Sequence, residues 1–209
     1  MTRAFLADVR RCATSGPARR TLWQLFWENY GLQALLAYRL GRWLLQAQRT
    51  CSWWPVLPLG WSVYYLLVSY VRLAFDIRLE LSADIGPGLY IGHFGGLHLH
   101  GCSIGANCSV AQLTKIGPAA EGASGPVIGE RVWIGAHARI VGAYRIGPDT
   151  TVSAGAVVRA DMPDRALCMG NPARVILRYY DNRSILRLEE ETPAIVPSVP
   201  SAASENVQP

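Results

Sequence analysis

Apolar residues return at every sixth position along the middle of the chain, with polar residues and glycines between them. The series consists of Ile85, Ile91, Leu97, Ile104, Val110, Ile116, Ile128, Ile134, Ile140, Ile146, Val152 and Val158. A six-residue step fits neither a helix of about 3.6 residues per turn nor a long strand of period two. It fits a coil of three short strands, in which about 18 residues bring the chain back over its start. The pattern therefore predicts stacked coils around one buried column of Ile and Val.

Two breaks interrupt this period. The step from Leu97 to Ile104 is seven residues long, which accommodates a corner at Gly101. Between Ile116 and Ile128 the stretch 118–126 lacks an inward apolar residue, so we expect a loop that leaves the coil. Long loops on a rigid scaffold are where binding residues concentrate, so this loop marks the expected substrate side.

Residues 1–75 are predicted to form a helical N-terminal domain, because their apolar residues recur at threes and fours. Within residues 50–75, Pro55, Pro58 and Gly60 leave only 61–75 as an uninterrupted helix, which is too short to cross a bilayer comfortably. We interpret residues 50–75 as a helix buried against neighbouring subunits. The alternative is peripheral contact with a membrane surface through its aromatic residues.

The coils give a β-helix domain over residues 76–178. A cap helix is expected over 179–191, where it would cover the last coil. Residues 192–209 are rich in Pro, Ser, Ala and Val without periodicity, which predicts a disordered tail.

Composition narrows the choice of partners. The formal net charge is +5, but the arginines are spread out and Lys115 is the only lysine. Nucleic acid is therefore not expected, and an anionic small molecule or a membrane surface fits better. The five cysteines show no CxxC spacing and the N-terminus shows no secretion signal. We expect a cytoplasmic protein, with association with the inner face of the membrane as the alternative.

Three short stretches add a resemblance to these patterns. They are the runs 37–43 (AYRLGRW), 88–96 (GLYIGHFGG) and 170–174 (GNPAR). With the helical start and the hexapeptide coils, they resemble the serine acetyltransferase family, and within it the O-acetyltransferases of exopolysaccharide and colanic acid biosynthesis. The resemblance covers roughly residues 5–178. It implies a left-handed parallel β-helix, homotrimers with active sites between adjacent coils, acetyl-CoA as donor and no metal.

His93 is the expected catalytic base. Transfer of acetyl from a thioester to an alcohol needs a group that accepts the hydroxyl proton, and an imidazole near neutral pH suits this role. The family places a carboxylate just before the first coil to orient the base, but an ungapped count falls on Arg78, which cannot serve. Asp76 and Glu80 lie two residues either side on the same strand face, and of the two we favour Glu80.

The resemblance also implies a donor groove. Its matching positions are Thr114, Gly117, Ala136, Ala154, Arg159 and Arg174, and Lys115 at the root of the loop is a further candidate. Arginine suits the phosphates of acetyl-CoA through paired, charge-assisted hydrogen bonds. His98 and His100 alternate with two leucines on an outward strand face and are the candidates for substrate binding.

The acceptor positions depart from the serine enzymes. Gly92 stands where they carry an Asp, and Ser124-Gly125 stands where they carry an Arg-His pair. A site without these groups discriminates weakly for a zwitterionic amino acid. The sequence therefore favours a sugar hydroxyl on an exopolysaccharide precursor, free or lipid-linked, with serine O-acetyltransferase of cysteine biosynthesis as the alternative.

Two other classes compete with acetyl transfer. His93 and His98 have the spacing of a zinc pair in γ-carbonic anhydrase-like coils, but the earlier His of that site is missing. The coils could also serve as a non-catalytic trimeric scaffold whose N-terminal helices bind a partner.

Overall fold

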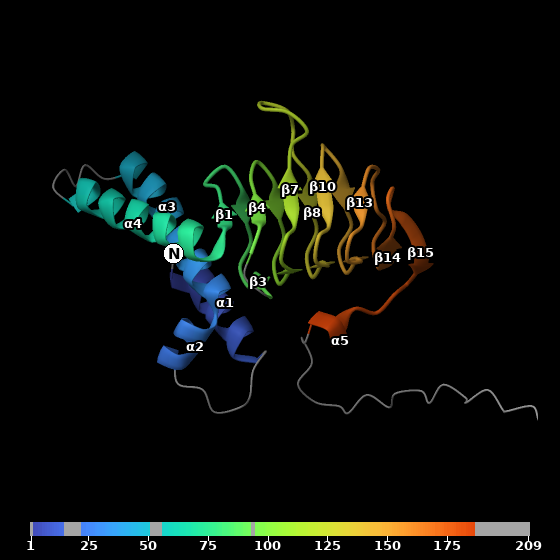
Figure 1. The fold of residues 1–209 in the computed structure, drawn as a ribbon, viewed down its shortest axis with the longest axis horizontal. Coiled ribbons are helices and arrows are strands. Elements are labelled where there is room, and N and C mark those ends of the chain that lie inside the picture. Colours follow the sequence, from blue (N-terminus) through green and yellow to red (C-terminus); the bar gives the residue numbers. More distant parts are fainter. Residues whose placement is uncertain (1, 15–21, 51–55, 93–94, 187–209) are drawn as a thin grey trace, which may run out of the picture.

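The computed structural model describes residues 2–14, 22–50, 56–92 and 95–186. Its first part consists of the helices α1 (Thr2–Thr14), α2 (Leu22–Glu28), α3 (Tyr30–Thr50) and α4 (Val56–Phe75). These helices gather at one end of a long stack of short strands (Figure 1).

The strands form the three sides of a prism, which we call sheets A, B and C. Sheet A contains β1 (Ile77–Leu79), β4 (Leu97–Leu99), β7 (Lys115–Gly117), β10 (Arg139–Val141) and β13 (Val157–Val158). Sheet B contains β2 (Asp84–Ile85), β5 (Ser103–Ile104), β8 (Val127–Ile128) and β11 (Arg145–Ile146). Sheet C contains β3 (Tyr90–Ile91), β6 (Ser109–Val110), β9 (Trp133–Ile134), β12 (Thr151–Val152), β14 (Ala166–Met169) and β15 (Arg174–Arg178).

The expected fold, a left-handed parallel β-helix after a helical part, is confirmed. All predicted inward residues from Ile85 to Val158 are between 0 and 5% exposed. Each strand pairs in parallel with its counterpart one coil away, except that β14 and β15, at the end of the described stack, pair antiparallel. Corners of neighbouring coils stack so closely that a Cβ on Gly105 would lie 2.6 Å from the carbonyl carbon of Gly129. Glycine after the inward residue is therefore required by packing at this corner.

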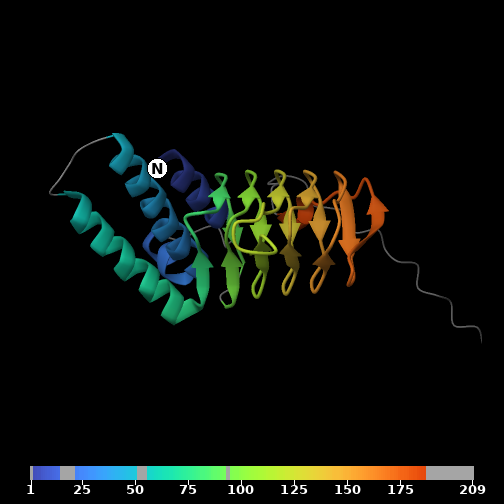
Figure 2. The same cartoon turned by 90° about the horizontal axis from the view of Figure 1, so that it is seen from above.

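Both breaks in the period appear as predicted. Gly101 has a φ of 50° at the corner between β4 and β5, which is a left-handed conformation that suits glycine. The loop 118–126 leaves the stack between β7 and β8, and its residues 119–124 are exposed (Figures 1 and 2).

Helix α4 differs from its prediction. It begins at Val56 rather than at Trp61, because Pro58 falls in the first turn, where its missing N–H costs no helical hydrogen bond. Its exposed apolar residues include Leu59, Leu66 and Leu73, while Tyr64 and Val71 are buried. No helix among the described residues is both long enough and apolar enough to cross a membrane.

A buried ion pair joins the helices to the first coil. The Asp8 carboxylate on α1 is fully buried and accepts hydrogen bonds from Arg39 on α3, at 3.0 and 3.3 Å. The same carboxylate accepts the backbone N–H groups of Gly88 and Leu89, at 2.7 and 3.1 Å. The pair thus holds two helices against the turn between β2 and β3.

Side chains of α3 also satisfy the backbone of this coil. The Arg39 guanidinium donates to the carbonyl oxygens of Ile85 and Gly86, each at 2.6 Å. The Tyr38 hydroxyl donates to the Ala83 carbonyl at 2.7 Å and accepts the Ile85 N–H at 3.2 Å. The first coil has no earlier coil beneath it, so α3 supplies the missing partners.

The C-terminal segment returns along the prism. After β15, the chain runs back to α5 (Arg183–Leu186), where Leu186 is buried. The expected cap over 179–191 is therefore helical only at 183–186 among the described residues. Residues 187–191 and the expected disordered tail 192–209 lie outside the described part of the chain.

Replacing Arg39 by Met should destabilise the protein by about 3–5 kcal/mol, because Asp8 would remain as a buried, unpaired carboxylate. Arg42→Met is the matched control, since Arg42 lies one turn further along α3 and pairs with the exposed Asp84 at 2.9 Å. Its cost should stay near or below about 1 kcal/mol. Urea unfolding at one protein concentration measures both, and equal losses would contradict the role of the buried pair.

Candidate active site

The expected catalytic corner lies between β3 and β4, at the edge of the prism where sheet C meets sheet A. His93 itself lies outside the described residues. The backbone on either side is fixed by hydrogen bonds: Gly92 N–H donates to Val110 O at 3.0 Å, and Gly95 N–H donates to Phe75 O at 3.0 Å. Gly92 is therefore anchored to the next coil, and Gly95 to the end of α4.

The outer face of sheet A carries the predicted site residues His98, His100 and Lys115. Arg78, His98, Lys115 and Arg139 occupy one register row across β1, β4, β7 and β10, and we call them the cationic row. Two residues after His98, the imidazole ring of His100 lies directly over Gly117 of β7. A Cβ added to Gly117 would overlap this ring. This face meets sheet C at one edge, and the loop 118–126 leaves from the other (Figure 1).

The two candidate carboxylates lie at opposite ends of β1. Ile77 is opposite Leu97, so Asp76 lies at the end of the strand nearer the His93 corner. Asp76 also pairs with Arg78 at 3.4 Å. Glu80 lies four residues on, about 13 Å along an extended strand, and accepts a hydrogen bond from Ser82 at 3.2 Å. The register therefore favours Asp76, whereas the sequence favoured Glu80.

Two of the predicted donor positions stack at the same edge as the His93 corner. Ala136 and Ala154 are in the corners that follow β9 and β12, and the Gly155 N–H donates to Ala136 O at 2.7 Å. Their small side chains leave the edge open to a ligand.

The remaining predicted donor positions differ in whether their side chains are accessible to a ligand. The Thr114 side chain is fully buried and its hydroxyl donates to Ala111 O at 2.8 Å, so it is not available to a ligand. Arg159 and Arg174 are exposed and lie after β13 and at the start of β15. The register places Arg159 at the end of sheet A from which the loop 118–126 leaves, whereas Arg174 pairs with Met169 at the end of β14 in sheet C, on the side of the His93 corner.

The environment of His98 favours its neutral form. Burial first, then the Arg78 guanidinium, lowers the pKa of His98 below its usual value of 6.5, while Asp76 opposes this effect. Lys115 and His100 lower the same pKa further. At pH 7 the His98 ring is therefore an uncharged hydrogen-bonding group between two cations.

Of the cysteines that the structure describes, Cys102 and Cys108 lie in the first coils and neither is an activated nucleophile. Burial raises the pKa of Cys102 to about 12 and that of Cys108 to about 11, so both thiols are protonated at neutral pH. Among the described residues, no three His, Cys, Asp or Glu side chains gather as a metal site requires.

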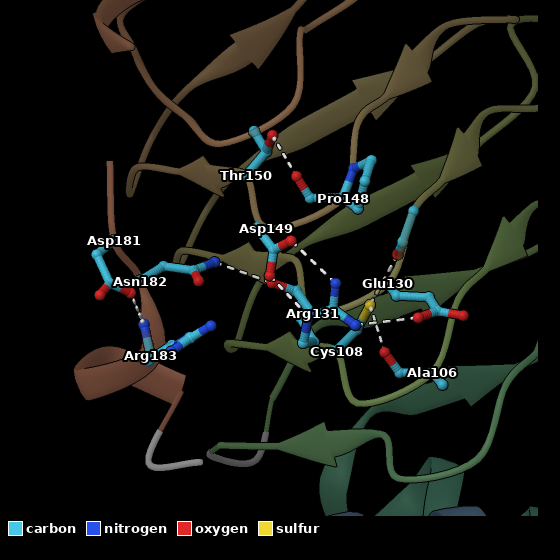
Figure 3. A network of polar contacts seen from close by, with 11 residues as sticks. Ala106, Cys108, Glu130, Arg131, Pro148, Asp149, Thr150, Asp181, Asn182 and Arg183 are labelled. Carbon is cyan, nitrogen blue, oxygen red and sulfur yellow. Dashed lines mark hydrogen bonds and ion pairs between the residues drawn. The ribbon is translucent and has the colours of Figure 1, made fainter. Parts of the chain in front are cut away.

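A pocket of about 330 Å³ lies elsewhere, where the corners between sheets B and C meet the C-terminal segment (Figure 3). Arg131 pairs there with Asp149 through two hydrogen bonds, at 2.7 and 2.9 Å, and the bonding to Arg131 lowers the pKa of Asp149. Asn182 is buried and donates to Arg131 O at 2.9 Å. These contacts attach the returning segment to the prism, and none of the predicted site residues lines the pocket.

The sequence indicates His98 and Lys115 as candidates but does not show that Arg78 and Arg139 lie in the same row. The alternation of Arg139 with the inward Ile140 marks an outward position, but only the coil register shows which residues lie beside it.

The prism of six-residue steps is the fold that the resemblance to hexapeptide-repeat acyltransferases implies. No protein-family model matches the chain. A serine acetyltransferase from Synechococcus elongatus is 31% identical over 181 residues, which are 85% of this chain and 70% of that protein. One from Helicobacter pylori is 28% identical over 174 residues, or 82% of this chain and 95% of that protein. Soybean serine acetyltransferase, solved in complex with serine, superposes with a TM-score of 0.69 at 30% identity, covering 83% of this chain and 68% of its own.

The chain belongs to the serine acetyltransferase family. It is an O-acetyltransferase that uses acetyl-CoA as donor.

The pKa of His98 should rise toward 6.5 in Lys115→Met, because removing a neighbouring cation lowers the cost of protonating the ring. Arg145→Met, which removes a cation from the outer face of sheet B, should leave it unchanged. Proton NMR titration of the His98 ring, assigned with His98→Gln, measures this pKa in buffer without phosphate. A value at or above 6.5 in the unmodified protein would contradict the described environment.

Proposed function

We propose that the acceptor hydroxyl is that of serine, which makes the protein a serine O-acetyltransferase. The observation that carries this proposal is the similarity to enzymes of that activity over more than four fifths of the chain, including the soybean structure solved with serine. This similarity favours serine over the sugar hydroxyl that the acceptor positions Gly92 and Ser124-Gly125 predict.

In the proposed reaction, the serine hydroxyl attacks the thioester carbonyl carbon of acetyl-CoA directly. His93 takes the hydroxyl proton as the new C–O bond forms, the C–S bond breaks, and the imidazolium returns that proton to the CoA thiolate. Asp76 orients the His93 ring and stabilises the imidazolium. An acetylated cysteine is not part of this scheme, since Cys102 and Cys108 are held as buried thiols.

We place the donor along the edge formed by Gly92, Ala136 and Ala154. Backbone groups at such an edge can hydrogen-bond the pantetheine amides, and Arg159 and Arg174 offer guanidinium groups to phosphates. A homotrimer, in which a neighbouring prism closes this edge, remains part of the proposal.

A sugar hydroxyl is the second candidate acceptor, and Gly92 is the observation that favours it. A Cβ on Gly92 would make only ordinary contacts, 3.8 Å from Tyr90 Cε1 and 3.9 Å from Val110 O. Packing therefore leaves room for the Asp that serine enzymes carry at this position. Ser124 is exposed on the loop where those enzymes carry an Arg, so the chain lacks two groups that would hold a zwitterion.

The proposal predicts release of CoA from acetyl-CoA on addition of L-serine, and little release with nucleotide sugars. His93→Ala should lower kcat for serine by roughly 10²–10⁴-fold, the usual effect of removing a general base. A thiol-trapping assay of CoA release measures both. Turnover of a sugar but not of serine would show that serine is not the acceptor. Full activity of His93→Ala would show that His93 is not the general base.

A further inference from the structure

Helix α4 carries an exposed apolar face. Its inner side packs against α3 and β1, where Tyr64 and Val71 are buried. Figure 2 shows α4 as the outermost of these helices, on the far side of α3 from α1. Six large apolar side chains of α4 are between 42 and 88% exposed, and we call them the α4 face: Leu59, Val63, Tyr65, Leu66, Tyr70 and Leu73.

The exposed apolar side chains are concentrated on this helix. The α4 face holds six of the 17 large apolar side chains that are exposed among the described residues, whereas β15 holds two, Ile176 and Leu177. Steps of three and four residues separate most members of the face, so they lie side by side along the helix. Single exposed apolar residues are ordinary, but a continuous apolar surface of this kind marks an interaction site.

The net positive charge of the chain also lies in its helical part. Residues 1–75 contain nine arginines and only two carboxylates, Asp8 and Glu28. Residues 76–209 contain eleven Lys and Arg against thirteen Asp and Glu. In α4 the single charged residue is Arg72, which is exposed next to Leu73. An apolar helix face in a basic part of a protein is typical of segments that lie on anionic membrane surfaces.

A second copy of the chain fits the α4 face less well. Helix α4 has 20 residues, so a seam along it is about 30 Å long and roughly 10 Å wide, or on the order of 300 Å² on each copy. A stable protein interface buries about 800 Å² per partner. The six side chains also spread over about 160° around the helix, which is wider than the seam that a partner helix contacts. A lipid surface adapts to this whole arc.

We propose that the α4 face lies on an anionic lipid bilayer, with α4 parallel to the membrane plane. The leucines enter the boundary between headgroups and acyl chains, the tyrosines lie at the level of the headgroups, and Arg72 faces the lipid phosphates. The contact is peripheral. It corresponds to the membrane contact that the sequence offers as the alternative for residues 50–75. No member of the α4 face belongs to the proposed active site, so the proposal does not depend on the acceptor.

The test compares the unmodified full chain with the double variant Leu59→Gln/Leu66→Gln. Glutamine has a helix propensity close to that of leucine, and both positions are exposed, so the fold is expected to persist. The matched control is Ile176→Gln/Leu177→Gln, which removes two exposed apolar side chains from β15, at the other end of the prism (Figure 1).

Co-sedimentation measures binding to vesicles of phosphatidylcholine alone and of phosphatidylcholine with about 30% phosphatidylserine, a strongly anionic surface. We expect the unmodified protein to bind the anionic vesicles. The α4 double variant should bind them about tenfold or more weakly, because it loses buried apolar area, and the β15 control should stay within about twofold.

The contribution of charge has its own pair of variants. Arg72→Gln should weaken binding to the anionic vesicles by about fivefold, the usual effect of one cation near such a surface. Arg145→Gln makes the same change in net charge on the outer face of sheet B and should leave binding unchanged.

Absence of binding of the unmodified protein to both kinds of vesicle would overturn the proposal, as would equal losses in the α4 and β15 double variants. Sedimentation equilibrium tests the other occupant: a smaller oligomer formed by the α4 double variant alone would mean that another subunit covers the face, which also overturns it. If thermal melting shows that the double variant is unfolded, Leu73→Gln repeats the comparison at the most exposed position. Failure of the proposed function would appear separately, as absent serine acetylation with vesicle binding intact.

Discussion

A β-helix has an open end, and the contact that closes it here is the buried pair of Asp8 and Arg39. Without a preceding coil, the backbone N–H and C=O groups of the first coil lack partners, and α1 and α3 provide them through side chains. Helix α4 packs against α3 and leads directly into β1 of sheet A. Since Gly95 donates to the last residue of α4, the position of the proposed catalytic corner also depends on this end of the stack.

The period of six residues is sufficient to predict the prism, its buried column and its ejected loop, because every coil repeats an inward apolar residue at the same spacing. Contacts between the helices and the prism do not follow this spacing and could not be predicted from it. Asp8 and Arg39 are 31 residues apart on different helices, and no periodicity links them. The start of α4 was wrong because Pro58 was taken as a helix breaker rather than a first-turn residue. The division into domains at residues 75, 178 and 191 stays a prediction.

The candidate site was predictable in part, for a related reason. Resemblance indicated His93 and the edge of small residues, but the choice between Asp76 and Glu80 depended on the pairing of β1 with β4. The cationic row was hidden because Arg78, His98, Lys115 and Arg139 are separated by 20, 17 and 24 residues. These spacings differ from one another and from the roughly 18 residues of a regular coil, and the ejected loop lengthens the last of them, so only the folded register shows one row.

The central claim is that acetyl transfer takes place at the edge between sheets C and A, beside the outer face of sheet A. A crystal structure of the protein with bound CoA tests this most directly. The account predicts CoA along Gly92, Ala136 and Ala154, with its thiol toward His93. CoA bound instead in the pocket between Arg131 and Arg183, with this edge empty, would contradict it.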